Sequence, residues 1–337
     1  MVTLKEVRES NSALRAREPG QVILVTGATS GIGETTLLQM AIHMNAPTVY
    51  LVGRNEGAGR RILEKVTQAN PQATFHFIQA DVSSLSAVDA VCDEIKRKEK
   101  KLDILFLSAG VLHFGARREN SDGLDTMFAL RYYVRMRFIM NLLPLLSQCQ
   151  SRVVSVLDAG KESRLIESDL ELRHHHSTNN VIGHSNTMTV LAMEHLAKQY
   201  PSISFLHVFP GLVITNLAAS DMSWPWSSLV RYLRPLFAFL AVPLEESGQR
   251  HLFCATSERY PPRFAVTRGE EGSSVAGEVA RGSNGEKGSG VYSLNWDGEL
   301  VRAKDFLAQY RARGMGETVW AHTLDVFERV LSKTTRA

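Results

Sequence analysis

The sequence has few of the features that mark disulfide-stabilised or nucleic-acid-binding proteins. Its 337 residues include three cysteines, which are far apart and odd in number, so we expect no disulfide framework and no Cys-x-x-Cys metal or redox site. The chain has 38 Lys and Arg against 35 Asp and Glu, and no basic run is interleaved with aromatic residues. This balance argues against a nucleic-acid partner.

Long uninterrupted hydrophobic runs are also absent. The first 20 residues lack the apolar core of a signal peptide, and the bulky stretch at 223–243 is interrupted by Arg231 and Arg234. We therefore expect no membrane span and a cytoplasmic protein. With 44% hydrophobic and 22% charged residues, the composition is that of an ordinary globular chain that can bury a core.

Short apolar strands alternate with helical segments over the first two thirds of the chain. The expected strands are 21–25, 48–52, 74–79, 102–107, 152–157 and 203–208, and the expected helices are 33–45, 57–69, 84–99, 123–147 and 184–199. Strands that alternate with helices form a parallel sheet with right-handed crossovers. The predicted fold class is α/β, a doubly wound Rossmann-type parallel sheet in a single domain.

This domain is expected to carry an extension at each end and one insertion. The expected parts are a polar N-terminal extension with one short helix (1–20), the dinucleotide-binding domain (21–257), an aromatic-rich substrate lid within it (216–245), and a last part of the same domain (258–337). A helix pair that completes the core and an interfacial contact are the alternatives for the lid. The last part comprises a flexible Gly/Ser/Glu-rich loop at 268–290, a strand at 291–295 and a helical tail at 301–333.

The strongest local motif is Thr26-Gly27-Ala28-Thr29-Ser30-Gly31-Ile32-Gly33, which lies directly after the first strand and before the first helix of the sheet. Gly27 permits a tight turn, Gly31 lets the backbone approach a pyrophosphate, and Gly33 allows the helix to pack closely on the strand. The helix N-terminus adds unpaired N–H groups and a positive dipole. The motif therefore predicts a nicotinamide dinucleotide site.

The spacing T-G-x-x-x-G-I-G resembles the short-chain dehydrogenase/reductase superfamily, and the resemblance covers most of residues 21–257. Four further segments support it: Asp81-Val82, Leu107-Ser108-Ala109-Gly110 with Ser in place of the usual Asn, Pro210-Gly211-Leu212-Val213-Ile214-Thr215, and Glu194 with Leu196-Ala197. In that family the acid contacts the adenine ring and the P-G-x-x-x-T segment holds the nicotinamide carboxamide. The C-terminal parts look most like members found in filamentous fungi, often in secondary-metabolite pathways.

The motif and the resemblance together imply a set of cofactor-binding residues. They are Thr26, Gly27, Ser30, Gly31, Ile32, Gly33, Arg54, Asp81, Ala109, Gly110, Pro210, Gly211, Val213 and Thr215. Arg54 follows the second strand, where an acid would bind a ribose 2′-OH and a basic residue would accept a 2′-phosphate. NADP(H) is therefore preferred over NAD(H), and a solvated surface arginine is the alternative for Arg54.

The catalytic pattern of the family is altered at four positions. Alignment on the resemblance places Asp158 at the Ser position, His184 at the Tyr position, Met188 at the Lys position and Arg131 at the Asn position. Met188 has no charge and no donor, so it can neither hold a ribose hydroxyl nor lower the pKa of a neighbour. The usual proton relay is therefore absent.

His184 and Asp158 are the catalytic candidates that remain. An imidazole with a pKa of about 6.5 can deliver a proton near neutral pH, and Asp158 is either its orienting partner or a solvated carboxylate at the end of a loop. A structural histidine is the alternative for His184. Ser185, Tyr132 and Tyr133 are further substitutes that the spacing does not select.

His174, His175 and His176 suggest no metal site. Adjacent histidines point in diverging directions, and no Cys, Asp or Glu completes a known ligand spacing nearby. We expect ordinary loop residues and no bound metal.

Three functions remain open from the sequence. The first is an NADP(H)-dependent oxidoreductase acting on a hydrophobic carbonyl or alcohol, with a non-standard proton relay. The second is a non-redox isomerase or cyclase on the same scaffold, and the third is a catalytically inactive dinucleotide-binding protein. The expected partner is a hydrophobic small-molecule substrate, and the resemblance implies a homo-oligomer formed through the fourth and sixth helices.

Overall fold

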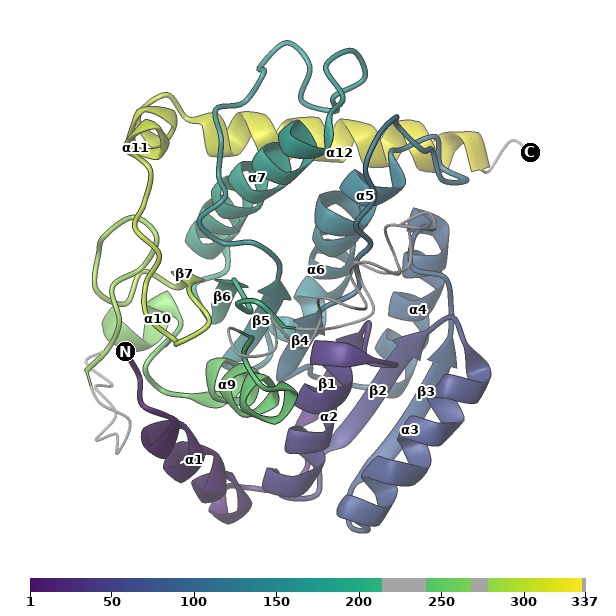
Figure 1. Ribbon diagram of the computed structural model, residues 1–337, viewed down its shortest axis with the longest axis vertical. Coiled ribbons are helices and arrows are strands. Elements are labelled where there is room, and N and C mark those ends of the chain that lie inside the picture. Colours follow the sequence, from purple (N-terminus) through teal and green to yellow (C-terminus); the bar gives the residue numbers. More distant parts are fainter. Residues whose placement is uncertain (214–240, 268–277, 335–337) are drawn as a thin grey trace.

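The computed structural model describes residues 1–213, 241–267 and 278–334 (Figure 1). Thr215 and most of the predicted lid at 216–245 therefore lie outside the described residues, as does the first part of the predicted loop at 268–290. At the edge of the lid, Val242 N donates to Leu212 O at 2.8 Å. The two sides of the predicted insertion thus meet.

Seven parallel strands form one sheet in the order β3-β2-β1-β4-β5-β6-β7. Their bounds are β1 (Val22–Thr26), β2 (Thr48–Gly53), β3 (Thr74–Gln79), β4 (Ile104–Leu107), β5 (Ser151–Val156), β6 (Ile203–Val208) and β7 (Val291–Leu294). The strand order reverses between β1 and β4, which is where an open sheet of this kind binds its ligand. The predicted doubly wound α/β fold is confirmed.

Helices cover both faces of the sheet because the strands are apolar on both sides. In β4, Leu105 belongs to one buried cluster and Phe106 to the other, as the twofold alternation of a strand requires. The first cluster includes α4 (Leu85–Lys98), α6 (Val134–Leu146) and α7 (Thr178–Gln199). The second includes α2 (Gly31–His43), α3 (Glu56–Ala69) and α9 (Leu244–Thr256).

Two predicted helices differ from the structure by three residues or more at their N-termini. The helix predicted from 184 begins at Thr178, because Ser177 caps it by accepting from Asn180 N. The helix predicted from 123 begins with α5 (Thr126–Phe128) and passes through a π-helical turn, η2 (Ala129–Tyr133), into α6. Such turns are frequent at functional sites, and this one contains Arg131.

The N-terminal extension is part of the packed structure. It forms α1 (Leu4–Ser12) and the 3₁₀ turn η1 (Ala13–Ala16). The sequence predicted one short helix in this extension. Asn11 of α1 is buried and donates to the backbone and the side chain of Gln249 on α9, at 2.9 and 2.6 Å. These bonds hold the extension against the domain.

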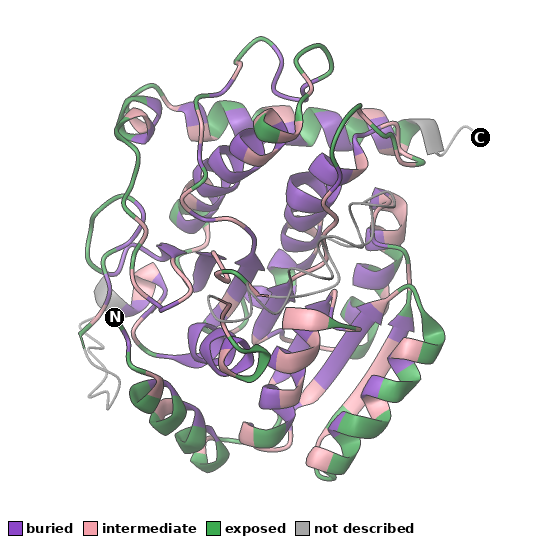
Figure 2. Ribbon diagram, in the orientation of Figure 1, coloured by how far each residue is buried: buried purple, intermediate pink, exposed green. Residues whose placement is uncertain are grey.

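The C-terminal residues form α10 (Arg263–Thr267), α11 (Asp305–Ala312) and α12 (Met315–Thr334), and α12 packs against α7 and α4. Tyr132 OH and Tyr133 OH meet Thr323 and His322 of α12 at 2.6 and 3.0 Å. Figure 2 shows α7 buried along most of its length. The chain itself thus covers part of the helical surface through which the resemblance implied self-association, which stays a prediction.

None of the helices in the described ranges is both long and apolar enough to cross a membrane.

The docking of α12 can be tested by shortening one of its buried side chains. Phe327 is 2% exposed and lies under the guanidinium of Arg137, so Phe327→Ala should lower the free energy of unfolding by about 3–5 kcal/mol in urea titrations. Leu324→Ala is the matched control because Leu324 is 41% exposed on the same helix, and its effect should stay within about 0.5 kcal/mol. Equal losses in the two variants would contradict the packing.

Candidate functional site

The glycine-rich turn touches the end of β4 through backbone atoms. Gly27 has φ +75°, and a Cβ atom there would lie 2.4 Å from Ala109 N. Ser108 Oγ donates to Thr26 O at 2.7 Å and fixes the same contact from the other side. Only glycine fits at position 27, because both the space and the left-handed backbone exclude a side chain.

The first turn of α2 opens directly from this contact. Gly33 is so close to the turn that a Cβ atom would lie 2.5 Å from Gly27 O, while Gly31 has φ +63°. Ser30 is the N-cap residue, yet its side chain accepts no hydrogen bond from the helix. The N-terminal amides of α2 therefore receive no side-chain cap, and a helix end of this kind binds anions such as a pyrophosphate.

Arg54 and Asp81 flank this turn at the ends of β2 and β3. The side chain of Arg54 is exposed, and no hydrogen bond or ion pair within the described part of the chain engages its guanidinium. Asp81 is also exposed, and its Oδ1 accepts from Ser83 N at 3.0 Å. Both lie on the β1-β2-β3 side of the switch point, where an adenosine would bind.

The other predicted cofactor residues lie on the β4-β5-β6 side. Ala109 O accepts from Arg135 at 2.9 Å, and a Cβ atom at Gly110 would enter open space. Pro210 and Gly211 follow β6, where Gly211 has φ +78° and packs closely against Trp296. Val213 is the last described residue before the gap.

Asp158, just after β5, Arg131 of η2 and Ser185 of α7 form a hydrogen-bonded chain. Arg131 donates through Nη2 to Asp158 Oδ2 at 2.6 Å and through Nε to Ser185 Oγ at 2.9 Å. Burial lowers the pKa of Arg131, and the nearby Asp158 carboxylate opposes that shift. The side chain of Asp158 is 33% exposed, so its carboxylate, at one end of the hydrogen-bonded chain, is accessible to solvent.

His184 lies apart from that chain. It is 1% exposed, and its Nε2 accepts from Ile166 N at 3.0 Å. Burial lowers the pKa of His184 to about 4, so the ring is neutral near pH 7 with its proton on Nδ1. The structure does not join His184 and Asp158 in a hydrogen-bonded pair, since each has another partner. Their catalytic roles stay predictions.

Met188, at the predicted Lys position, and the further candidates Tyr132 and Tyr133 have their contacts elsewhere. Met188 is fully buried in the apolar cluster of α4, α6 and α7. Tyr132 and Tyr133 point to α12, and burial raises the pKa of Tyr133 well above its ordinary value. Of the substitutes considered from the sequence, Ser185 is the one that contacts the Arg131–Asp158 pair.

The comparisons with known proteins agree with this geometry. A family model described as short chain dehydrogenase matches residues 21–162. Oxidoreductase AN1596 of Emericella nidulans is 46% identical over 99% of this chain and 100% of its own length. The short-chain dehydrogenase/reductase SAT2 of Stachybotrys chartarum is 27% identical over 93% of each chain.

The chain belongs to the short-chain dehydrogenase/reductase superfamily. Among solved structures, the NADPH-bound carbonyl reductase from chicken fatty liver aligns with a TM-score of 0.57 over 85% of this chain and 100% of that chain, at 16% identity. This likeness supports the fold. The predicted family and fold class are confirmed.

This member of the short-chain dehydrogenase/reductase superfamily also contains a buried arginine that the sequence reasoning missed. Arg135 is fully buried on α6 and donates only to neutral oxygen atoms at the ends of β4 and β5 and on its own helix. One signal was available in the sequence. Arg135 stands within the apolar run of 127–146 with no Asp or Glu on its helix, which points to a buried guanidinium with other partners.

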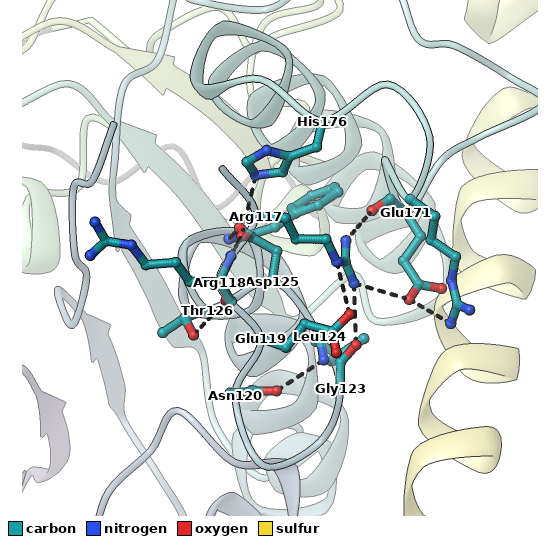
Figure 3. A network of polar contacts seen from close by, with 12 residues as sticks. Arg117, Arg118, Glu119, Asn120, Gly123, Leu124, Asp125, Thr126, Glu171 and His176 are labelled. Carbon is teal, nitrogen blue, oxygen red and sulfur yellow. Dashed lines mark hydrogen bonds and ion pairs between the residues drawn. The ribbon is translucent and has the colours of Figure 1, made fainter. Parts of the chain in front are cut away.

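A polar network ties together the loops that follow β4 and β5 (Figure 3). Asp125 caps α5 by accepting from Phe128 N at 2.9 Å, and His176 Nε2 lies 3.2 Å from its Oδ2. His175 turns instead to Asp169, at 3.0 Å. The two adjacent histidines therefore diverge, and within the described residues no group of three or more His, Cys, Asp or Glu side chains is placed to hold a metal ion.

Three buried histidines should make the fold less stable in mild acid. Burial lowers the pKa of His184 and His251 to about 4 and of His207 to about 3, from an ordinary 6.5. Each ring is protonated more readily in the unfolded chain, so each takes up a proton on unfolding below about pH 6.5. The free energy of unfolding should therefore fall, as pH drops toward 5, by about 1.4 kcal/mol per pH unit for each histidine.

Urea titrations of His251→Asn across this pH range give the direct check. The slope of unfolding free energy against pH should decrease by the share of one histidine, whereas His174→Asn, which alters an exposed ring, should leave it unchanged. An unaltered slope in His251→Asn would show that this ring is not held neutral by burial.

Proposed function

We propose that the chain is an NADP(H)-dependent oxidoreductase that acts on a hydrophobic carbonyl or alcohol, with a proton relay that differs from the family pattern. The observation that carries the proposal is the turn at 27–33, whose backbone lies against Ala109 and leads into an uncapped helix N-terminus. Similarity to a named oxidoreductase along the whole chain supports the same chemistry. The substrate that we propose is a secondary-metabolite intermediate, as the likeness of the C-terminal parts to members found in filamentous fungi implies.

Each part of the site has a task in this proposal. The N-terminal amides of α2 bind the pyrophosphate, Arg54 accepts the 2′-phosphate, and Asp81 lies beside the adenine. Ala109 and Gly110, with the segment from Pro210 to Val213, border the nicotinamide half. The bound cofactor supplies or accepts a hydride, and the protein positions and polarises the substrate.

Two exposed apolar side chains and one partly exposed carboxylate lie on the segments that follow β4, β6 and β5. Phe114, on the loop after β4, is 62% exposed, and Leu212, after β6, is 51% exposed. Exposed apolar side chains on the segments at the carboxyl ends of these strands favour a hydrophobic substrate. The 33% exposed side chain of Asp158 makes it the better placed of the two predicted acid–base residues, because His184 is buried and bonded to Ile166.

Turnover of purified protein with hydrophobic ketones or alcohols tests the reaction class. With NADPH or NADP⁺ present, the absorbance of the reduced nicotinamide should change in step with a product that differs from the substrate by two hydrogen atoms. A product of unchanged mass would instead support the isomerase or cyclase alternative. Cofactor binding without any turnover would support the inactive binding protein.

Cofactor choice is tested by Arg54→Ala. This variant should bind NADPH at least about tenfold more weakly while its affinity for NADH stays within about twofold, because a hydrogen bond to a charged group contributes about 1.5–3 kcal/mol. Arg60→Ala is the matched control, since Arg60 is exposed on α3 and pairs with Glu56. Equal weakening of both cofactors by Arg54→Ala, measured by calorimetry, would remove Arg54 from phosphate recognition.

A further inference from the structure

Arg135 carries a buried positive charge that no carboxylate contacts among the described residues. Its three guanidinium nitrogens all donate, and every acceptor is a backbone carbonyl or a hydroxyl. The acceptors are Leu130 O at 3.0 Å, Leu107 O at 2.9 Å, Ser155 Oγ at 2.7 Å, Val156 O at 2.8 Å and Ala109 O at 2.9 Å. Hydrogen bonds satisfy the donors in this way, but they leave the charge itself without a counterion.

The charges around Arg135 do not cancel. Arg131 lies one helical turn earlier and pairs with Asp158, so two guanidinium cations and one carboxylate leave one positive charge. His207, beneath them on β6, adds none, because burial lowers its pKa to about 3. Burial, and to a smaller extent the nearby Arg131, lowers the pKa of Arg135 to about 9, so Arg135 remains protonated at neutral pH.

This charge lies under one half of the proposed cofactor site. Leu107 is the last residue of β4 and Ala109 lies just after it, while Ser155 and Val156 are the last two residues of β5. With the adenosine half of a dinucleotide on the β1-β2-β3 side, the strand order places the nicotinamide half on the β4-β5 side. A charge in a buried, low-dielectric position acts on its surroundings more strongly than one at the surface.

The two redox forms of the cofactor respond differently to such a charge. The nicotinamide ring of NADP⁺ is a cation, whereas that of NADPH is neutral. The phosphates, riboses and adenine are the same in both forms, so their contributions cancel in the ratio of the two dissociation constants. That ratio therefore reports the electrostatic environment of the nicotinamide half.

We propose that Arg135, together with the Arg131–Asp158 pair, makes this site hold NADPH in preference to NADP⁺, so that in a mixture of the two forms it is loaded with the hydride donor for carbonyl reduction. The inference rests on the proposed function and adds a direction to it. In that direction the substrate carbonyl gains a hydride at carbon and a proton from solvent at oxygen, while NADPH becomes NADP⁺. The net positive charge also stabilises the negative charge that develops on the carbonyl oxygen. Arg135 acts through electrostatics and by holding Ala109, and is a positioning residue.

The test compares the dissociation constants of NADPH and NADP⁺ by calorimetry in variants that change the charge in opposite directions. Arg131→Gln removes one positive charge, so the preference for NADPH should fall by on the order of tenfold. Asp158→Asn removes the negative charge with little change of shape, so the preference should rise by a similar factor. These two variants are used because Arg135→Gln would leave buried carbonyls without donors and lose folding stability.

Arg137→Gln is the matched control. Arg137 is on the same helix and pairs with Asp89 of α4, outside the Arg131–Asp158–Ser185 chain, so its removal should leave the ratio unchanged. A wild-type protein that binds both forms equally, or the same ratio in Arg131→Gln and Asp158→Asn, would overturn this inference alone. Failure of both forms to bind the wild-type protein would overturn the proposed function, and this inference with it.

Discussion

The close approach of two backbones, at Gly27 and at Ala109, is the constraint on which the site depends. The space between them is too small for a Cβ atom, so the turn after β1 and the loop after β4 can meet only through glycine. This contact lies where the strand order of the sheet reverses, and it directs the first turn of α2 toward the crevice. The adenosine half and the nicotinamide half of the proposed site are defined by their positions on either side of it.

The sequence alignment predicts that the substrate end of the site keeps the scaffold of the superfamily while its polar groups come from other positions. The family carries its positive charge on a lysine of the helix that is α7 here, a position at which the sequence alignment finds an apolar residue. In this chain two arginines of the preceding helical segment, Arg131 and Arg135, place positive charge at the end of β5. Burying a guanidinium costs free energy, and five neutral oxygen acceptors offset that cost for Arg135.

Much of the fold could be predicted because it depends on local patterns. Apolar runs of four to six residues separated by amphipathic helices specify a parallel sheet, and the glycine motif specifies where its ligand binds. The helix starts at Thr178 and at Thr126 were missed because they depend on caps, Ser177 and Asp125, that lie within polar loops. The approximate bounds of a helix follow from periodicity, whereas its first residue depends on a single side chain.

The polar centre was harder to predict because it depends on contacts between distant segments. Alignment placed Arg131 and Asp158 at former catalytic positions, but only the folded chain shows that they pair and that Ser185 joins them. His184 was favoured for its chemistry, and the structure finds its ring buried and bonded to Ile166. A side chain's direction around a helix buried on nearly all sides is not encoded in its own periodicity, since α7 is covered by the sheet and by α12 alike.

The central claim is that the backbone amides of the turn at 27–33 bind a dinucleotide against the end of β4. Hydrogen–deuterium exchange of the wild-type protein, with and without saturating NADPH, tests it most directly. We expect slower exchange on addition of NADPH in the peptides that contain residues 27–33 and 108–110, and no change in the exchange of α12. Unchanged exchange in both of those segments, under conditions where NADPH is bound, would contradict it.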